Sequence, residues 1–213
     1  MPVGPFRSGG GEEPRAKLSS LSLARRPSDL KGACGRADHG AQWQLRKWGR
    51  VMNRGVCIGM MRPDELAAVR GLFGDYVASL AFDLGYQGIE AELAGLPSPY
   101  IAPHGALLVA RAAAPKRLIG TIGLRQLSND VAEIKRMYVV PDARGRSVGR
   151  ALLESCLAQA RCLGYQRVRL DSHRPSMALA IDLYRTLGFV EIAPYGPDLD
   201  QTIAFFELSL HER

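Results

Sequence analysis

The stretch RMYVVPDARGRSVGRALL, residues 136–153, constrains the fold more than any other part of this chain. Its apolar segment MYVV suits a buried strand, and its end is a helix-forming run. Between them lie Pro141, Gly145, Gly149 and three arginines. A strand joined to a helix through so small and basic a loop indicates an α/β protein. The loop itself is either a solvated turn or a site for an anion.

The remaining periodic segments fit the same class. An apolar stripe from Leu66 to Leu80 predicts a helix, with Asp64 as its N-cap. No internal repeat is present. The full order of predicted elements is a strand at 56–62, helices at 64–82 and 88–96, strands at 105–113, 117–127 and 131–140, a helix at 146–164, a strand at 166–172, a helix at 176–188, and strands at 189–195 and 201–210.

Residues 1–50 differ from the rest of the chain. They hold ten of the 28 Lys and Arg and four of the 21 Asp and Glu, so this leader carries six of the seven net positive charges. Rich in Gly, Ser, Pro and Arg, it buries too little apolar surface to offset its ordering entropy, and we expect disorder. Two other interpretations of residues 1–50 are an organellar targeting peptide and a true translation start at Met52 or Met60. Residues 51–213 form the expected domain.

The composition of the body narrows its class. Its charge is close to neutral, which argues against nucleic acid as a partner. No apolar run is long enough to span a bilayer, and we expect no membrane partner. The four cysteines show no CxxC pairing and the histidines are scattered, so we expect reduced thiols, no metal site and a cytoplasmic protein. We expect a monomer or a homodimer.

The basic loop, residues 144–150, has the chemistry of an anion site. A helix N-terminus carries free N–H groups and the positive end of the helix dipole. Gly145 and Gly149 let the backbone come close to a ligand. Arg144, Arg146 and Arg150 add positive charge. These features together fit a diphosphate.

Residues 133–190 also carry a family pattern. RGRSVGRALL resembles the R/Q-x-x-G-x-G/A loop of the GNAT superfamily, the acyl-CoA-dependent N-acetyltransferases, and AIDLYRTLGF resembles the next helix and strand of that family. The similar order of elements extends the resemblance to about three-quarters of the chain. It implies a mixed α/β fold with a mainly antiparallel central sheet flanked by helices. It also implies acetyl-CoA as co-substrate and direct attack by a primary amine of a small molecule or peptide.

The resemblance also implies which residues bind acetyl-CoA. The backbone of Met137, Tyr138, Val139 and Val140 would pair with the pantetheine amides, as one strand pairs with another. The N–H groups of the basic loop would hold the diphosphate. The residues implied there are Arg144, Gly145, Arg146, Ser147, Val148, Gly149 and Arg150.

Two positions depart from the family pattern. Ser147 stands where the loop has its first glycine, and a serine fits if its φ is negative. Met177 stands where the family helix often begins with asparagine, seven residues before the tyrosine of LYRTLGF. We expect one polar contact to the cofactor to be missing there.

The chemistry requires a base, because a lysine-like amine with a pKa near 10.4 must attack as the neutral form. Glu133 lies four residues before Met137, where some family members carry a base glutamate. Tyr184 matches the family tyrosine beside the sulfur and would act as the acid. A solvated charge paired with Lys135 and a core tyrosine are the respective alternatives. His173 is a further possible base.

Two other functions stay open at this level. One is a non-catalytic acyl-CoA-binding or sensing domain. The other is an acyltransferase that uses another acyl group or acts on a protein N-terminus. The acceptor itself is not specified by the sequence, although Asp83, Tyr86, Gln87 and Glu90 are expected to wall its site.

Overall fold

The centre of the fold is one eight-stranded sheet in the order β1-β2-β3-β4-β5-β6-β8-β7. The computed structural model describes residues 51–53, 55–80, 88–196 and 201–211. Every neighbouring pair is antiparallel except β5 and β6, which are parallel. The strands are β1 (Val51–Asn53), β2 (Val56–Met60), β3 (Ala106–Ala112), β4 (Arg117–Gln126), β5 (Val131–Val139), β6 (Arg167–His173), β7 (Val190–Ile192) and β8 (Ile203–Ser209). The predicted mixed, mainly antiparallel sheet is confirmed.

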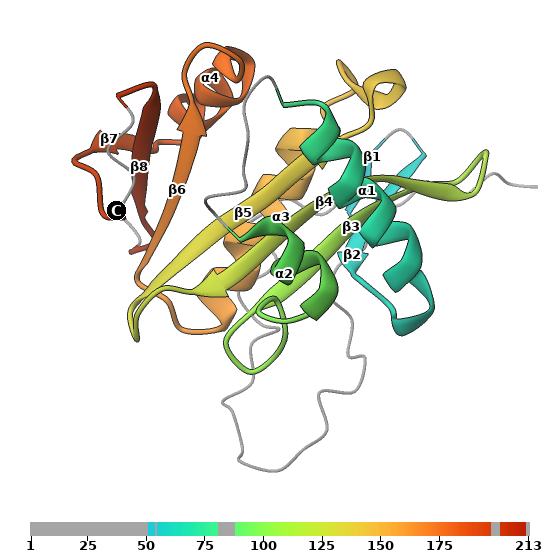
Figure 1. The fold of residues 1–213 in the computed structure, drawn as a ribbon, viewed down its shortest axis with the longest axis horizontal. Coiled ribbons are helices and arrows are strands. Elements are labelled where there is room, and N and C mark those ends of the chain that lie inside the picture. Colours follow the sequence, from blue (N-terminus) through green and yellow to red (C-terminus); the bar gives the residue numbers. More distant parts are fainter. Residues whose placement is uncertain (1–50, 54, 81–87, 197–200, 212–213) are drawn as a thin grey trace, which may run out of the picture. The chain divides into compact units, whose positions relative to one another are not determined.

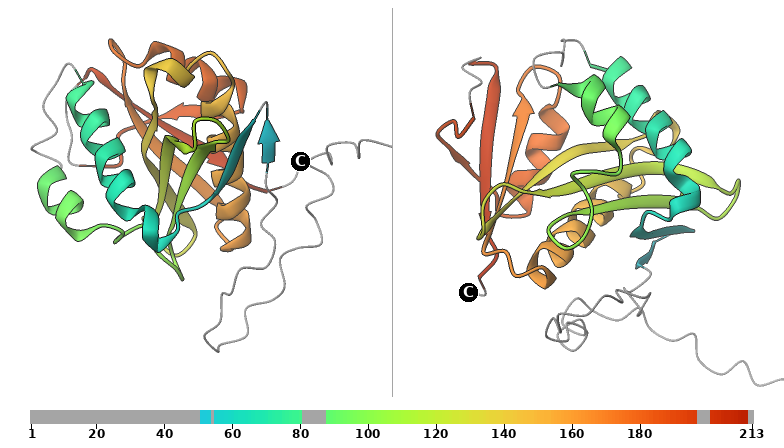
Figure 2. Two further views of the ribbon diagram at one scale, coloured as in Figure 1. Left: turned by 90° about the vertical axis from the view of Figure 1, so that its right-hand side faces the viewer. Right: turned by 60° about the horizontal axis from the view of Figure 1, so that its bottom comes forward.

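Helices cover both faces of this sheet, as Figures 1 and 2 show. Helices α1 (Leu66–Ala78) and α2 (Ile89–Gly95) lie on one face, and α3 (Val148–Cys162) lies on the other. Helix α4 (Ala178–Thr186) packs on β6 and shares the core of α3. Short 3₁₀ turns precede α1 at Pro63–Glu65 and α3 at Pro141–Ala143. None of the helices in the described ranges is long and apolar enough to cross a membrane.

Each face of the sheet has its own core, and the sequence periodicity explains both. On α3, Val148, Leu152 and Cys156 recur every fourth residue and are buried against the sheet. On the other face, Val69 and Phe73 of α1 are fully buried in a smaller cluster. The two layers therefore hold the sheet rigidly between them and fix the strand ends on which a site can be built.

Two local predictions were incomplete or wrong. Strand β1 was not predicted, since Val51–Asn53 is only three residues long. Asp64 does not cap α1, because the 3₁₀ turn contains it and Glu65 takes the N-cap position without a side-chain cap. The carboxylate of Glu65 instead accepts hydrogen bonds from the side chains of Arg62 and Arg111. The predictions for residues 1–50 fall outside the described ranges.

Strands β5 and β6 form a fork in the sheet. Their pairing starts at Val131 opposite Arg167 and ends at Glu133 opposite Arg169. Beyond that point the two strands separate, as Figure 1 shows. β5 also bulges against β4 between Thr121 and Gly123. The fork leaves the second half of β5 without a neighbouring strand on one side.

The bulge in β5 is centred on Arg136. Its φ is +55°, in the left-handed region that residues other than glycine rarely adopt. Such a conformation costs about 1–2 kcal/mol, so the surroundings must stabilise it. The contacts of the Arg136 side chain, described below, do so.

Candidate active site

The fork opens into a cleft of ≈ 730 Å³. Its walls come from the second half of β5, the basic loop, the end of β6, α1 and α4. The cleft therefore joins the predicted anion site to the predicted acid. The described residues that line it include Tyr76, Lys135, Arg136, Met137, Tyr138, Val139, Arg144, Gly145, Ser147, Val148, Gly149, Arg150, Asp171, Ser172, His173, Met177 and Tyr184.

The backbone of β5 presents two residues to this cleft. The N–H of Val140 donates to Ile119 of β4, and its carbonyl accepts from Ala143, so Val140 has no main-chain group to offer a ligand. Backbone groups alternate in direction along a strand. Those of Met137 and Val139 therefore point into the fork, where a ligand amide can pair with both groups of Met137 and with the N–H of Val139, whose carbonyl accepts from Arg144. Of the four backbone contacts predicted for acetyl-CoA, the geometry is compatible with these two, and they stay a prediction.

The basic loop ends in the N-terminus of α3. Gly145 has a φ of +72°, and Ser147 has a φ of +61°. The condition for a comfortable serine, a negative φ, is not met, so Ser147 holds a left-handed conformation that glycine adopts more readily. The Ser147 side chain makes no cap hydrogen bond to α3. The first N–H groups of this 15-residue helix thus remain available for an anion.

Of the three loop arginines, two line the cleft. Arg144 donates from Nε to the carbonyl of Val139 at 3.0 Å, and its guanidinium lies over the ring of Tyr138. Arg150 pairs with Glu154 across 3.1 Å on the exposed face of α3. Arg146 is exposed and is not among the lining residues of the described chain.

Gly149 lies where α3 passes closest to β5. A Cβ at this position would stand 3.1 Å from Cε of Met137 and 3.9 Å from Val139 and Leu183. The glycine therefore serves the close packing of helix on strand, and a side chain here would push Met137 towards the cleft.

Tyr184 reaches the cleft from α4. Its ring is buried against Phe189 and Phe206, and its hydroxyl donates to Sδ of Met137 across 4.0 Å. Burial raises the pKa of Tyr184 above its usual value, and the negative charge of Asp171 adds to the effect. The phenol therefore keeps its proton at neutral pH, as an acid must.

Glu133 lies at the closed end of the fork, 3% exposed. One oxygen of its carboxylate, Oε2, accepts from Arg125 at 2.7 Å, and the other, Oε1, accepts from the hydroxyl of Tyr195 at 2.9 Å. Glu133 is not among the described residues that line the cleft. A role as base stays a prediction, and the geometry places Lys135 between it and the cleft.

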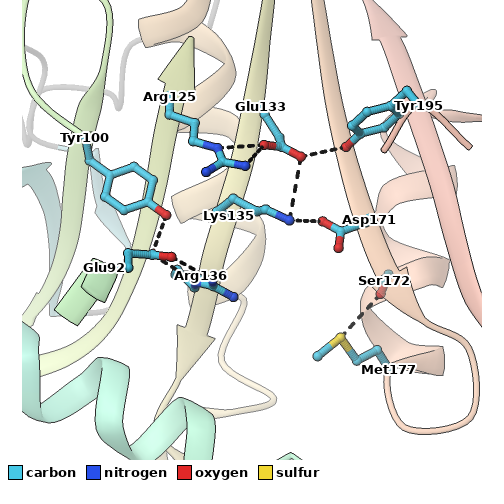
Figure 3. A network of polar contacts seen from close by, with 10 residues as sticks. All are labelled: Glu92, Tyr100, Arg125, Glu133, Lys135, Arg136, Asp171, Ser172, Met177 and Tyr195. Carbon is cyan, nitrogen blue, oxygen red and sulfur yellow. Dashed lines mark hydrogen bonds and ion pairs between the residues drawn. The ribbon is translucent and has the colours of Figure 1, made fainter. Parts of the chain in front are cut away.

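Lys135 and Asp171 were missed as site residues by the sequence analysis. Nζ of Lys135 lies 2.6 Å from Oδ1 of Asp171 and 3.6 Å from Oε1 of Glu133, as Figure 3 shows. The pair therefore bridges β5 and β6 just beyond the last paired residues. The signal that could have found it is the parallel register: Lys135 and Asp171 each lie two residues past the matched Glu133 and Arg169.

A second ion pair anchors α2 to the bulge. Arg136 donates to both carboxylate oxygens of Glu92 at 2.9 and 2.7 Å, and the Tyr100 hydroxyl donates to Glu92 at 2.6 Å (Figure 3). Burial opposes ionisation of Glu92, but the hydrogen bonds and charge of Arg136 outweigh it and lower the pKa of Glu92 below its usual value. This contact holds Arg136 in its left-handed conformation.

The end of β6 completes the cleft. The Ser172 hydroxyl donates to Sδ of Met177 at 3.4 Å, and Nδ1 of His173 lies 2.7 Å from the Ser176 hydroxyl. Met177 lines the cleft at the position where the family often has asparagine, so the wall there is a thioether. Among the residues that the structure describes, no group of three or more His, Cys, Asp or Glu could hold a metal ion. Asp83, Tyr86 and Gln87 lie outside the described ranges, and Glu90 is exposed on α2.

The comparison with known families decides the class of the protein. Residues 66–189 match the Acetyltransferase (GNAT) family. The chain belongs to the GNAT family. An uncharacterised N-acetyltransferase of Schizosaccharomyces pombe is 29% identical over 149 residues, which cover 70% of this chain and 90% of the relative.

Solved GNAT structures share the fold. An acetyltransferase of the GNAT family from Staphylococcus aureus superposes with a TM-score of 0.62 at 21% identity, covering 73% of this chain and 99% of the other. The yncA protein of Salmonella typhimurium, solved with acetyl-CoA, gives a TM-score of 0.58 at 20% identity over 75% of this chain and 96% of its own. By its match to the GNAT family, the chain is an acyltransferase.

The cleft fits an acyl-CoA on its own features. It has a cationic end at the N-terminus of α3, an unpaired strand edge at Met137 and Val139, and a buried phenol at its inner end. These match, in order, a diphosphate, a chain of amides and a thioester.

Proposed function

We propose that the protein transfers an acetyl group from acetyl-CoA to a primary amine by direct attack. The observation that carries the proposal is the fork between β5 and β6, whose open strand edge leads from the basic loop to Tyr184. A ligand that pairs with Met137 and Val139 while its diphosphate sits on α3 directs its far end towards Tyr184.

Each proposed contact has its own physical support. The N–H groups at the start of α3, with Arg144 and Arg150, hold the diphosphate. The backbone groups of Met137 and the N–H of Val139 hold the amides, and another strand N–H near Val139 donates to the oxyanion. Tyr184 protonates the departing thiolate. Because a thiol has a pKa of about 8.5, that help is modest, on the order of tenfold.

An acetyltransferase needs a group that accepts the proton of the attacking amine, whereas a non-catalytic acyl-CoA sensor does not. Two carboxylates, Glu133 and Asp171, lie at the inner end of the fork with Lys135 between them. Glu133 remains the base that the family resemblance proposes. A sensor has no need for such a group, so turnover decides between the two functions.

The test is turnover of acetyl-CoA against a panel of amines, followed by release of free thiol. The panel holds n-butylamine, phenethylamine, putrescine, free amino acids and a tripeptide with a free N-terminus. We expect thiol release with at least one class, and the tripeptide tests transfer to a protein N-terminus. Propionyl-CoA in a parallel series tests the acyl group. Binding of acetyl-CoA in calorimetry without thiol release on any amine would favour the sensor.

The chemistry of the cysteines supports a proposed location. Cys57 and Cys156 are thiols outside any disulfide, and burial raises the pKa of Cys156 so that it stays protonated. Unpaired thiols suit a reducing compartment. This supports cytoplasmic residence as part of the proposal.

A further inference from the structure

Asp171 is the carboxylate that the cleft exposes at its inner end. Its side chain is 16% exposed and lines the cleft, whereas that of Glu133 is 4% exposed and does not. Among the described residues, its one hydrogen-bond and ion-pair partner is Lys135, which contacts Oδ1. The other oxygen, Oδ2, bonds to no described residue and can receive a ligand.

The position of Asp171 relative to the proposed acid supports a role in the reaction. The charge of Asp171 acts on Tyr184 from α4 and on Tyr76 from α1, and both tyrosines line the same cleft. Asp171, Tyr184 of α4 and Tyr76 of α1 therefore line one cleft within reach of each other's charge. A cationic amine that approaches the thioester there meets Asp171.

Lys135 keeps a second carboxylate contact when Asp171 takes up a proton. The lysine side chain is 11% exposed and contacts two carboxylates, Asp171 at 2.6 Å and Glu133 at 3.6 Å. Glu133 also pairs with Arg125, so the cluster holds two cations, Lys135 and Arg125, and two carboxylates, Glu133 and Asp171. When Asp171 takes up a proton, Lys135 keeps its contact with Glu133, whereas loss of both carboxylates would leave a strongly unfavourable buried ammonium.

We infer that Asp171, rather than Glu133, accepts the proton of the attacking amine, and that Glu133 acts through Lys135 as a positioning residue. This inference rests on the proposed function. Asp171 was not among the site residues predicted from the sequence.

The step balances as follows. The acceptor ammonium loses one proton to Oδ2 of Asp171, and the nitrogen lone pair forms a C–N bond to the thioester carbonyl carbon. The C–S bond breaks with its electron pair on sulfur, and the thiolate takes the proton of the Tyr184 hydroxyl. The second amine proton restores that hydroxyl through solvent, and Asp171 releases its proton to solvent. The net products are an amide, a thiol and one proton.

The experiment compares Asp171→Asn with Glu133→Gln and with Asp182→Asn as a matched control. Asp182 is an exposed residue of α4 outside the cleft lining. The asparagine still accepts from Lys135 but cannot take a proton. With acetyl-CoA and the amine panel, we expect Asp171→Asn to lower kcat by about 10²- to 10⁴-fold, and the dissociation constant of acetyl-CoA to stay within about threefold. The control should match the wild type.

The pH profile separates a base from a merely structural residue. The titratable groups around Asp171 are Lys135 and Glu133 on β5, Tyr76 on α1, Tyr184 on α4, His173 on its own strand and Tyr195 after β7. In the wild type kcat should fall on the acidic side as Asp171 becomes protonated, and Asp171→Asn should abolish this limb. Glu133→Gln should move the limb to lower pH, because one negative charge near Asp171 is gone.

Each contrary outcome has a separate meaning. A limb that persists in Asp171→Asn and vanishes in His173→Gln would overturn the assignment in favour of the histidine. If Glu133→Gln lowers kcat by about 10²- to 10⁴-fold while Asp171→Asn stays active, the role of proton acceptor returns to Glu133. A wild type that binds acetyl-CoA but releases no thiol would overturn the proposed function, and the assignment with it.

Discussion

A Glu92→Gln substitution tests the anchor between α2 and the bulge of β5. The side chains of Glu92 and Arg136 are 9% and 3% exposed, so the variant leaves a buried guanidinium without its counter-ion. Breaking one partner of a buried pair costs about 3–5 kcal/mol. For a domain of this size each kcal/mol lowers Tm by about 2–4 °C, which gives a fall of about 6–20 °C.

The assay is thermal unfolding followed by circular dichroism, with Glu90→Gln as the control because Glu90 is an exposed residue of the same helix. The folded pKa of Glu92 is below its ordinary value of 4.5. The pair therefore stabilises the fold above the unfolded pKa, and this contribution is lost as pH falls through the folded pKa. The gap in Tm between wild type and variant should narrow in acid. Equal melting of Glu92→Gln and Glu90→Gln at pH 7 would refute the reasoning.

Further substitutions test the cleft. Ser147→Gly should raise Tm, because relief of the left-handed strain of about 1–2 kcal/mol exceeds the added chain entropy of glycine; a lower Tm would show that the serine is needed. Arg144→Ala should weaken acetyl-CoA binding by about 10- to 150-fold in calorimetry, from a charge-assisted contact of about 1.5–3 kcal/mol, and by less at high salt; equal binding would leave Arg144 with only its bond to Val139. Gly149→Val should weaken binding in a folded protein as the new side chain displaces Met137; wild-type affinity would make the loop a plain turn. Tyr184→Phe should lower kcat about tenfold with acetyl-CoA binding unchanged, and an unchanged kcat would leave Tyr184 a core residue.

The periodic elements of the fold were accessible from the sequence. The stripe of Val148, Leu152 and Cys156 predicted α3, and the glycine at 164 marked its end. Short-range signals failed where a tertiary contact outweighed them: Asp64 has the chemistry of a cap, but Glu65 is fixed by Arg62 and Arg111 instead. Strand β1 is too short to carry an alternating pattern.

The site was accessible in part, for a similar reason. The basic loop and Tyr184 each lie within a continuous sequence motif, so they could be recognised from a single sequence. The pairing of Lys135 with Asp171 spans two strands that are 36 residues apart in the chain, and it follows from strand register, which a single sequence does not specify. The same holds for Glu92 and Arg136, which come together only because β5 bulges. The backbone of Val140 was assigned to the cofactor because a sequence does not show that its N–H already donates to Ile119 of β4.

The fork has a consequence for how the fold responds to its ligand. Three residue pairs join β5 to β6, so the sheet consists of two smaller sheets, β1 to β5 and β6 to β7, with a short hydrogen-bonded joint between them. A bound chain of amides that pairs with Met137 and Val139 lengthens this joint by acting as one more strand. At a ligand concentration 100 times Kd, the added stability is about 2.7 kcal/mol. Amide hydrogen exchange in β6 and β8 should then slow as the cleft fills. The exchange rate of these two strands would therefore report how much of the protein has acyl-CoA bound.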